Sequence, residues 1–311
     1  MVKTKLFNWI GGKKWLSKEL NELYEGVLQS KDITTYVEPF AGGLGAFLYT
    51  LETLKNHGVK KYILNDVNET IITIYNEIKE NYTELFENYW KIEEEYSKTI
   101  VPEVLKLNKT KQKEEIKSLL IPARDFYESQ KLVFNNLKLS DIKKSIPYFL
   151  FLSQHSFNGV YRENSKGGFN TPFNWEAGLS KKEDRLEVFN EYNKIFNLVN
   201  VEFYNKSAFE IIDIYLKEND VMFYLDPPYL NESIGENKYN KDHFGINEQK
   251  ILLDQIKNMD TVIFSNHYLK IFIDFCENNN FKYKEVFRNN LINSDPTKRS
   301  QKISEILAFK Y

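Results

Sequence analysis

Cysteine is almost absent from this chain, which has a single one, Cys276, among its 311 residues. One thiol excludes an intrachain disulfide and a thiolate metal cluster, and its place in the apolar run 271–276 predicts a buried core residue. No apolar run approaches the ~18 residues of a membrane-spanning helix, and neither a signal-peptide core nor a twin-arginine stretch begins the chain. We therefore expect a soluble, cytoplasmic protein.

The chain also lacks an excess of either charge. Its 42 Lys and Arg residues stand against 44 Asp and Glu, a formal net charge of −2. This excludes a bulk polycation, so any nucleic-acid binding must come from a local basic surface. No Gly-Lys-Ser/Thr phosphate loop and no carboxylate–histidine cluster with metal spacing occurs. Aromatic residues are abundant, with 20 Tyr and 23 Phe, which suits a core or base-stacking surfaces. The length allows two domains, or one domain with a large insertion.

One stretch, residues 221–229, carries the most chemical information. The apolar run 221–225 predicts a buried strand, which two prolines then end. Asp226 therefore lies at the carboxyl end of a strand, where open α/β sheets bind ligands. Asp226 and the Pro227 carbonyl can accept two N–H bonds from a planar base with an amino group, and Tyr229 offers a stacking face. By itself the tetrapeptide also fits an ordinary turn with a capping Asp.

A glycine-rich turn follows a second predicted strand at Tyr36 and Val37. Gly42 and Gly43 let a ligand approach the backbone closely, and Asp66 ends another short strand about 20 positions later, a spacing that suits a ribose hydroxyl pair. Nothing in the turn prefers pyrophosphate, and a nicotinamide cofactor stays open by fold-level analogy alone.

The middle of the chain, from residue 69 to about 145, is predicted to be helical, charged and rich in lysine. Most of the lysines between 106 and 117 fit a solvated helix surface, and a role facing DNA stays open. After it, the tetrapeptide 165–168 resembles the tip of a β-hairpin. The polar side chains around this tip could read base edges in a major groove or belong to an ordinary surface loop. The polar loop 231–243 is predicted to be a mobile lid, and residues 286–291 and 303–309 a terminal pair of strands.

Four motifs occur in one order along the chain. They are Trp-x-Gly-Gly-Lys at 9–13, Glu-Pro-Phe-x-Gly-Gly-x-Gly at 38–45, Asn-Gly-x-x-Arg with Gly-x-Phe-Asn-x-Pro between 158 and 172, and Asp-Pro-Pro-Tyr at 226–229. With them the chain resembles, over nearly its whole length, the Dam-type DNA adenine methyltransferases of the alpha group and D12 class. The resemblance implies an α/β fold: a Rossmann-like, S-adenosylmethionine-dependent methyltransferase sheet with an inserted helical and β-hairpin target-recognition domain.

The resemblance also implies site residues by their positions in these motifs. The implied catalytic residues are Asp226, Pro227, Pro228 and Tyr229. The implied contacts of S-adenosylmethionine are Trp9, Lys13, Glu38, Phe40, Gly42, Gly43, Asp66 and Asp226. The implied DNA contacts are Asn158, Arg162, Asn164, Lys166, Asn170 and Pro172. Among these, Arg162 matches a position that can read guanine.

The implied organisation is a discontinuous catalytic domain, residues 1–80 and 198–311, with a target-recognition insertion at 81–197. The implied reaction is sequence-specific methylation of the 6-amino group of a flipped adenine in double-stranded DNA, in a restriction–modification system or a phage. Two departures from the family pattern occur. Ser207 and Ala208 stand where many relatives carry an acid before Phe209, and residues 174–176 weigh against GATC as the target.

Two alternatives remain at this point. The 4-amino group of cytosine has the same chemistry as that of adenine, and a protein of this fold could bind DNA without catalysis. We expect a monomer that needs no metal and no membrane, with any cognate restriction endonuclease acting separately.

Overall fold

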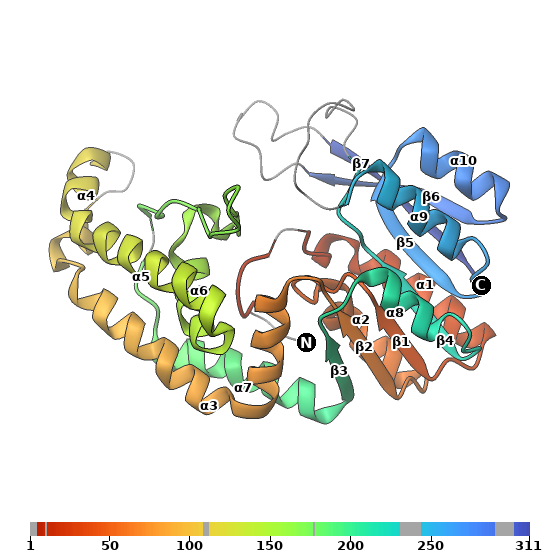
Figure 1. The fold of residues 1–311 in the computed structure, drawn as a ribbon, viewed down its shortest axis with the longest axis horizontal. Coiled ribbons are helices and arrows are strands. Elements are labelled where there is room, and N and C mark those ends of the chain that lie inside the picture. Colours follow the sequence, from red (N-terminus) through yellow and green to blue (C-terminus); the bar gives the residue numbers. More distant parts are fainter. Residues whose placement is uncertain (1–4, 10, 108–111, 177, 231–243, 290–301) are drawn as a thin grey trace. The chain divides into compact units, whose positions relative to one another are not determined.

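The computed structural model in Figure 1 describes residues 5–9, 11–107, 112–176, 178–230, 244–289 and 302–311. The predicted lid at 231–243 and the lysines at 109 and 111 lie outside these residues. The chain forms two compact units. The helical unit is Met1–Gly12 with Asn68–Val199, and the sheet unit is Lys13–Val67 with Asn200–Tyr311. The units therefore divide after residues 67 and 199, not after 80 and 197, and the first twelve residues belong to the helical unit. That the insertion recognises the target remains a prediction.

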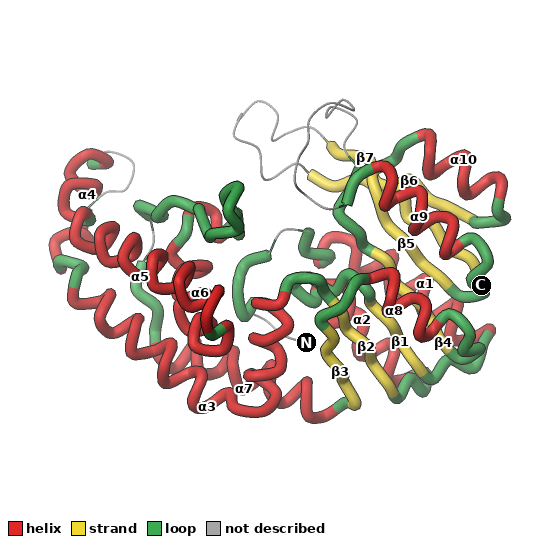
Figure 2. The backbone as a smooth tube through the Cα atoms, viewed as in Figure 1, coloured by secondary structure: helices red, strands yellow, loops and turns green. Residues whose placement is uncertain are grey.

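The sheet unit contains one sheet of seven strands in the order β3-β2-β1-β4-β5-β7-β6, drawn in yellow in Figure 2. The strands are β1 (Thr35–Glu38), β2 (Lys61–Asn65), β3 (Asn200–Tyr204), β4 (Val221–Leu225), β5 (Val262–His267), β6 (Lys282–Asn289) and β7 (Lys302–Lys310). The first five pair in parallel, and β7 runs antiparallel to β5 and β6. Successive strands build outward from β1 on one side and then restart with β4 on the other. The crevice between the carboxyl ends of β1 and β4 is thus the switch point at which such sheets bind ligands.

Helices cover both faces of this sheet. They are η1 (Lys14–Leu16), α1 (Ser17–Ser30), α2 (Gly45–Asn56), α8 (Ala208–Tyr215), α9 (Ile246–Ile256) and α10 (Lys270–Asn278). Val37, Phe223 and Phe264 point to one face, in a core cluster shared with α8, α9 and α10. Their strand neighbours point to the other face, where Tyr24 of α1 contacts Tyr224. Burial on both faces explains why these strands are continuous apolar runs in the sequence.

The helical unit is built on α3 (Glu69–Lys98), a long helix with a kink at Asn81. Its other elements are η2 (Pro102–Lys106), α4 (Lys113–Leu119), α5 (Ile121–Ser140), α6 (Ile142–His155), η3 (Phe157–Gly159) and α7 (Lys182–Leu198). The Asn68 side chain caps α3 by accepting from the amides of Thr70 and Ile71. Helix α6 packs against α3 and α5, and α7 packs against α3. Aromatic side chains fill the space between them. For example, the ring centres of Phe189 on α7 and Phe86 on α3 lie 5.2 Å apart.

The predicted β-hairpin is not a regular one. The segment after α6 is held by two isolated antiparallel bridges, Ser156 with Phe173 and Glu163 with Phe169, and forms no ladder of strands. We call this segment, residues 156–174, the bridged loop. Helix α7 was not predicted from the sequence. Within the described residues, no helix is long and apolar enough to cross a membrane.

Candidate active site

Asp226 follows β4 directly and is held by two partners in the sheet unit. Lys13 Nζ lies 2.7 Å from its Oδ2, and the Ser265 hydroxyl donates to its Oδ1 at 3.3 Å. Ser265 is itself hydrogen-bonded to the buried Tyr224 hydroxyl at 2.8 Å. The two side chains of the Lys13–Asp226 pair are only 5% and 17% exposed, so water screens their attraction weakly. The carboxylate is thereby fixed at the carboxyl edge of the sheet.

The turn after Asp226 is held by polar side chains on α9 and β5. Gln249 Nε2 donates to the Pro228 carbonyl at 2.8 Å. His267 Nδ1 donates to the Leu230 carbonyl at 2.8 Å, and the Leu230 amide donates to Asn266 at 3.2 Å. In the described part of the chain, no group donates to the Pro227 carbonyl. The Pro227 carbonyl, next in the chain to the Asp226 carboxylate, is thus left without a donor from these residues.

Tyr229 is contacted on its ring and at its hydroxyl. Lys13 Nζ lies 5.1 Å from the centre of its ring, and the His267 ring meets it at 5.1 Å and 76°. Its hydroxyl donates to Glu305 Oε2 at 2.9 Å. Burial, with the charges of Asp226 and Glu305 adding to it, holds the pKa of the Tyr229 phenol well above its ordinary value. The phenol therefore stays protonated.

The glycine-rich turn contacts Asp66, the acid that the spacing predicts for a ribose hydroxyl pair. The Gly42 amide donates to Asp66 Oδ2 at 2.9 Å, and the Ala41 amide donates to the Asn65 carbonyl at 2.8 Å. Gly42 has φ of 46°, in the left-handed region that glycine adopts most easily. Gly42 and Gly43 are partly exposed, so their backbone can be approached at the end of β1.

Glu38, at the end of β1, is 2% exposed. It accepts a hydrogen bond of 2.8 Å from Tyr36, whose hydroxyl lies 3.2 Å from that of Tyr24. Burial raises the pKa of Glu38 to about 8, although the Tyr36 hydrogen bond lowers it. This carboxyl is thus mostly protonated at neutral pH.

Beside the glycine turn, the predicted Phe40 belongs to an aromatic group whose other members, Phe209 and Phe244, were not predicted as site residues. The Phe40 ring meets the edge of Phe244 at 5.3 Å, and Phe209 stacks on Phe244 at 5.8 Å and 10°. Phe209 is the second residue of α8, where the Ser207 amide donates to the Glu210 carboxylate at 3.0 Å. Glu210 is therefore engaged in capping and does not replace the acid that many relatives carry before Phe209.

The predicted DNA contacts gather on the bridged loop of the helical unit. All six are exposed: Asn158, Arg162, Asn164, Lys166, Asn170 and Pro172. One of them has a structural task, because Asn164 Oδ1 accepts from the amides of Lys166 and Gly168 and so shapes the tip. Those two bonds measure 2.9 and 3.1 Å. Asn135 of α5 braces the loop through both the amide and the carbonyl of Phe169.

Trp9 also lies in the helical unit. Its ring stacks on that of Tyr161, with centres 5.7 Å apart and planes at 24°. The preceding residue, Asn8, packs directly on Gly159 of the bridged loop. The structure thus brings Trp9 together with the bridged loop, while Lys13, Glu38, Phe40, Gly42, Asp66 and Asp226 come together in the sheet unit.

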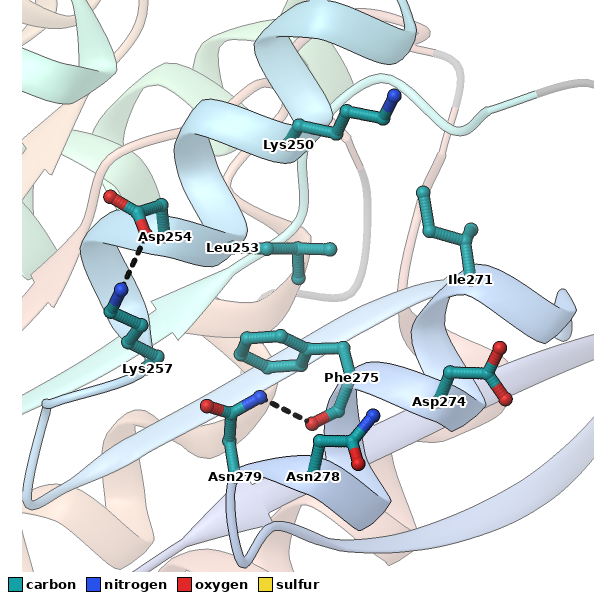
Figure 3. Close-up of a pocket in the computed structure, with 9 residues that line it drawn as sticks. All are labelled: Lys250, Leu253, Asp254, Lys257, Ile271, Asp274, Phe275, Asn278 and Asn279. Atoms are coloured by element: carbon teal, nitrogen blue, oxygen red, sulfur yellow. Dashed lines mark hydrogen bonds and ion pairs between the residues drawn. The ribbon is translucent and has the colours of Figure 1, made fainter.

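A shallow groove of about 360 Å³ lies between α9 and α10 (Figure 3). Leu253 and Phe275 point into it, and Asp254 and Lys257 form an exposed ion pair at its rim. None of the nine residues that line it belongs to the predicted site. Across the described residues, no group of three or more His, Cys, Asp or Glu could hold a metal ion.

Comparison with known proteins identifies the family. The model of the D12 class N6 adenine-specific DNA methyltransferases matches residues 9–290. The chain is 30% identical to the type II methyltransferase M.MjaIII of Methanocaldococcus jannaschii, over 97% of both chains. It is 27% identical to a DNA adenine methylase of Haemophilus influenzae, over 96% of this chain and 91% of the relative. It is 25% identical to the type II methyltransferase M1.LlaDCHI of Lactococcus lactis subsp. cremoris, over 97% and 94%. This chain therefore belongs to the D12 class N6 adenine-specific DNA methyltransferases.

Proposed function

We propose that Asp226 and the Pro227 carbonyl hold the 6-amino group of an adenine that has been turned out of double-stranded DNA. The observation that carries this proposal is the turn after β4. Gln249 and His267 bind the carbonyls of Pro228 and Leu230, whereas no described group donates to that of Pro227. A fixed carboxylate and an available carbonyl, adjacent in the chain, match the two N–H groups of an amino nitrogen.

These two acceptors address the difficulty of the reaction. The 6-amino group of adenine is a poor nucleophile, because its lone pair is delocalised into the ring. Hydrogen bonds from both N–H groups to Asp226 and Pro227 favour a pyramidal nitrogen whose lone pair points away from the ring. Positioning of this kind and a fixed negative charge are large sources of rate enhancement. The proton that the nitrogen loses passes to solvent.

The residues at the carboxyl edge of β1 and β2 fit S-adenosylmethionine, the methyl donor that the family implies. Asp66 presents a carboxylate next to the Gly42 amide, where ribose hydroxyls could bind. Phe40 and Phe244 provide an apolar surface suited to a purine. When bound, this donor supplies an electrophilic methyl group on a positively charged sulfur. The residues that we assign to S-adenosylmethionine in the sheet unit are Lys13, Glu38, Phe40, Gly42, Gly43, Asp66 and Asp226. We assign Trp9 to it by family position.

A base inside a duplex cannot reach Asp226, so the adenine must leave the helix. Stacking on Tyr229 would replace the stacking that the base loses, which is worth about 1–3 kcal/mol per base. The exposed side chains of the bridged loop supply donors and acceptors for the neighbouring base pairs, and Arg162 suits the two acceptors of guanine. We further propose that the enzyme acts as a monomer in the cytoplasm. Light scattering on the purified protein tests the monomer.

The experiment that tests the reaction uses unmethylated plasmid DNA and labelled S-adenosylmethionine, followed by nucleoside digestion and modification-aware sequencing. We expect 6-methyladenine at one short motif, and 4-methylcytosine would instead support the alternative acceptor. The Asp226→Ala variant should lose methylation while its fold and much of its DNA binding remain. Asp254→Ala, which removes an exposed carboxylate on α9, serves as the matched control. Retained turnover in Asp226→Ala would refute the assignment.

A further inference from the structure

A buried acid, Glu305, holds the hydroxyl of Tyr229 and has no role in the reaction proposed above. It lies on β7 directly opposite His267 of β5. Only 1% of Glu305 is exposed. One carboxylate oxygen accepts from the Tyr229 hydroxyl at 2.9 Å, and the other forms an ion pair with Arg288 of β6. The Tyr229 hydroxyl is thus held by β7, through an acid that β6 pairs.

An acid at this position needs an explanation, because a run of buried apolar residues follows it along the strand. Residues 306–309, which follow it, are all buried and apolar. A buried carboxylate is costly unless it is paired and hydrogen-bonded. The Arg288 guanidinium supplies the opposite charge, and the Tyr229 hydroxyl supplies a hydrogen bond. Charged residues that break a local apolar pattern are expected at functional sites.

The contacts of Tyr229 fix its ring at both ends. At the backbone end, Gln249 and His267 hold the turn from Pro228 to Leu230. At the other end, Glu305 holds the hydroxyl. Two fixed ends determine the plane of a ring, and stacking strength depends on that plane and its offset. A phenylalanine at the same place would fill similar space and have no such second attachment.

We propose that Glu305 is a positioning residue that acts through Tyr229, fixing the ring on which the target adenine stacks. The proposal rests on the stacking role given to Tyr229 above. Arg288 keeps Glu305 in place and compensates its charge. The effect should therefore appear in how the flipped base is held, with cofactor binding unchanged.

The test compares Glu305→Ala, Tyr229→Phe and the double variant with the wild-type protein. The first measurement is the fluorescence of a bound duplex with 2-aminopurine at the target position, which falls when the analogue stacks on an aromatic ring. The second is the single-turnover methylation rate on the natural duplex. We expect both single variants to lose about tenfold or more in rate, the size of effect that small misplacements cause. Both should also quench 2-aminopurine less, and the double variant should lose no more than either single one.

Matched control variants distinguish an effect on the position of the Tyr229 ring from an effect on folding. Glu305→Gln keeps the volume and an oxygen acceptor for the phenol, so it should stay within about threefold of wild type. Glu285 is an exposed acid on the neighbouring strand β6 and accepts a hydrogen bond from the Ser304 hydroxyl. Glu285→Gln removes its charge and should behave as wild type. Should Glu305→Ala not fold, Tyr229→Phe and Glu305→Gln still decide the matter, since the hydroxyl itself is removed in the first.

The outcomes distinguish this inference from the function on which it rests. Wild-type rate and quenching in Tyr229→Phe, with loss of both in Tyr229→Ala, would overturn the role of Glu305 and leave the stacking role intact. Wild-type behaviour of Tyr229→Ala would overturn the stacking role itself. Losses that multiply in the double variant would show that Glu305 acts by another route, which also overturns the inference.

Discussion

Glu38 shows how one buried side chain can link stability to pH. Its ordinary pKa is 4.5, and burial raises it to about 8 in the folded protein. Between these values the folded state holds a proton that the unfolded state releases. The contribution of Glu38 to the free energy of unfolding is thus complete below the lower value and is lost as pH rises through the upper one. Lys13, Asp226 and Tyr36 surround this carboxyl and modify the same shift.

We therefore predict that the melting temperature of the ligand-free protein falls between about pH 5 and pH 8, in part because of Glu38. Glu38→Gln should remove that part, since the amide does not titrate, and its melting temperature should fall less over the same range. Thermal unfolding at a series of pH values measures both proteins. Parallel curves for the two would contradict the assigned pKa.

Gly159 is a second residue whose identity is fixed by its surroundings. It has φ of 62°, and a Cβ built there would lie 2.1 Å from Asn8 Nδ2. We predict that Gly159→Ala destabilises the protein by at least about 1–2 kcal/mol, the cost of left-handed backbone for an ordinary residue, and weakens DNA binding. Urea unfolding and a DNA-binding titration measure the two effects. Gly178→Ala is the control, since nothing lies within 4 Å of its added Cβ. Equal stability of the two variants would contradict this account.

At the scale of elements, the strands that carry the site could be predicted from the sequence. Strand β4 is buried at all five positions, so it appears as an unbroken apolar run that ends at Asp226. The glycine turn and Asp66 were also predicted together, because their spacing reflects one strand–turn–helix–strand unit. Helix α7 was not predicted, although its buried residues Val188, Tyr192 and Phe196 repeat at helical spacing.

Other parts of the site depend on tertiary contacts that no local pattern encodes. Tyr229 and Glu305 are 76 positions apart, and only the pairing of β5 with β7 brings them together. The bridged loop has the turn residues of a hairpin, yet side chains such as Asn135 replace most of the ladder that strands would make. The DNA-binding residues on it were predicted by family motif, and their roles stay predictions.

The support of the Pro227–Tyr229 turn by α9 gives a prediction at this scale. Gln249 is fully buried, and its amide bridges the Pro228 carbonyl and Asn266. Gln249→Ala should leave the turn less well fixed and lower kcat by about 10-fold to 100-fold, with little change in DNA affinity. Steady-state kinetics and a binding titration measure this. Lys250→Ala, on the exposed side of the same helix, is the control. A change in DNA affinity with kcat unchanged would assign Gln249 another role.

For the whole molecule, the charge balance constrains how DNA is bound. The chain carries a formal net charge of −2 and its substrate is a polyanion, so general attraction cannot supply the affinity. Cations must be placed locally where the phosphates lie. The exposed Arg162 and Lys166 of the bridged loop are such cations, and they differ in what they can recognise. A guanidinium can bind two acceptors of one guanine, whereas an ammonium is a point charge suited to phosphate.

We predict that the two cations separate specificity from general affinity. Lys166→Ala should weaken binding to all sequences alike and reduce the slope of log affinity against log salt by about 0.9, the value for one lost phosphate contact. Arg162→Ala should lose about 1–3 kcal/mol of discrimination at one base pair of the target. Titrations of cognate and single-substituted duplexes at several salt concentrations measure both. Lys144→Ala, at the opposite end of α6 from the bridged loop, should change neither quantity. If Arg162→Ala weakened every duplex equally, Arg162 would contact phosphate, and the reading of guanine would have to come from another residue of the loop.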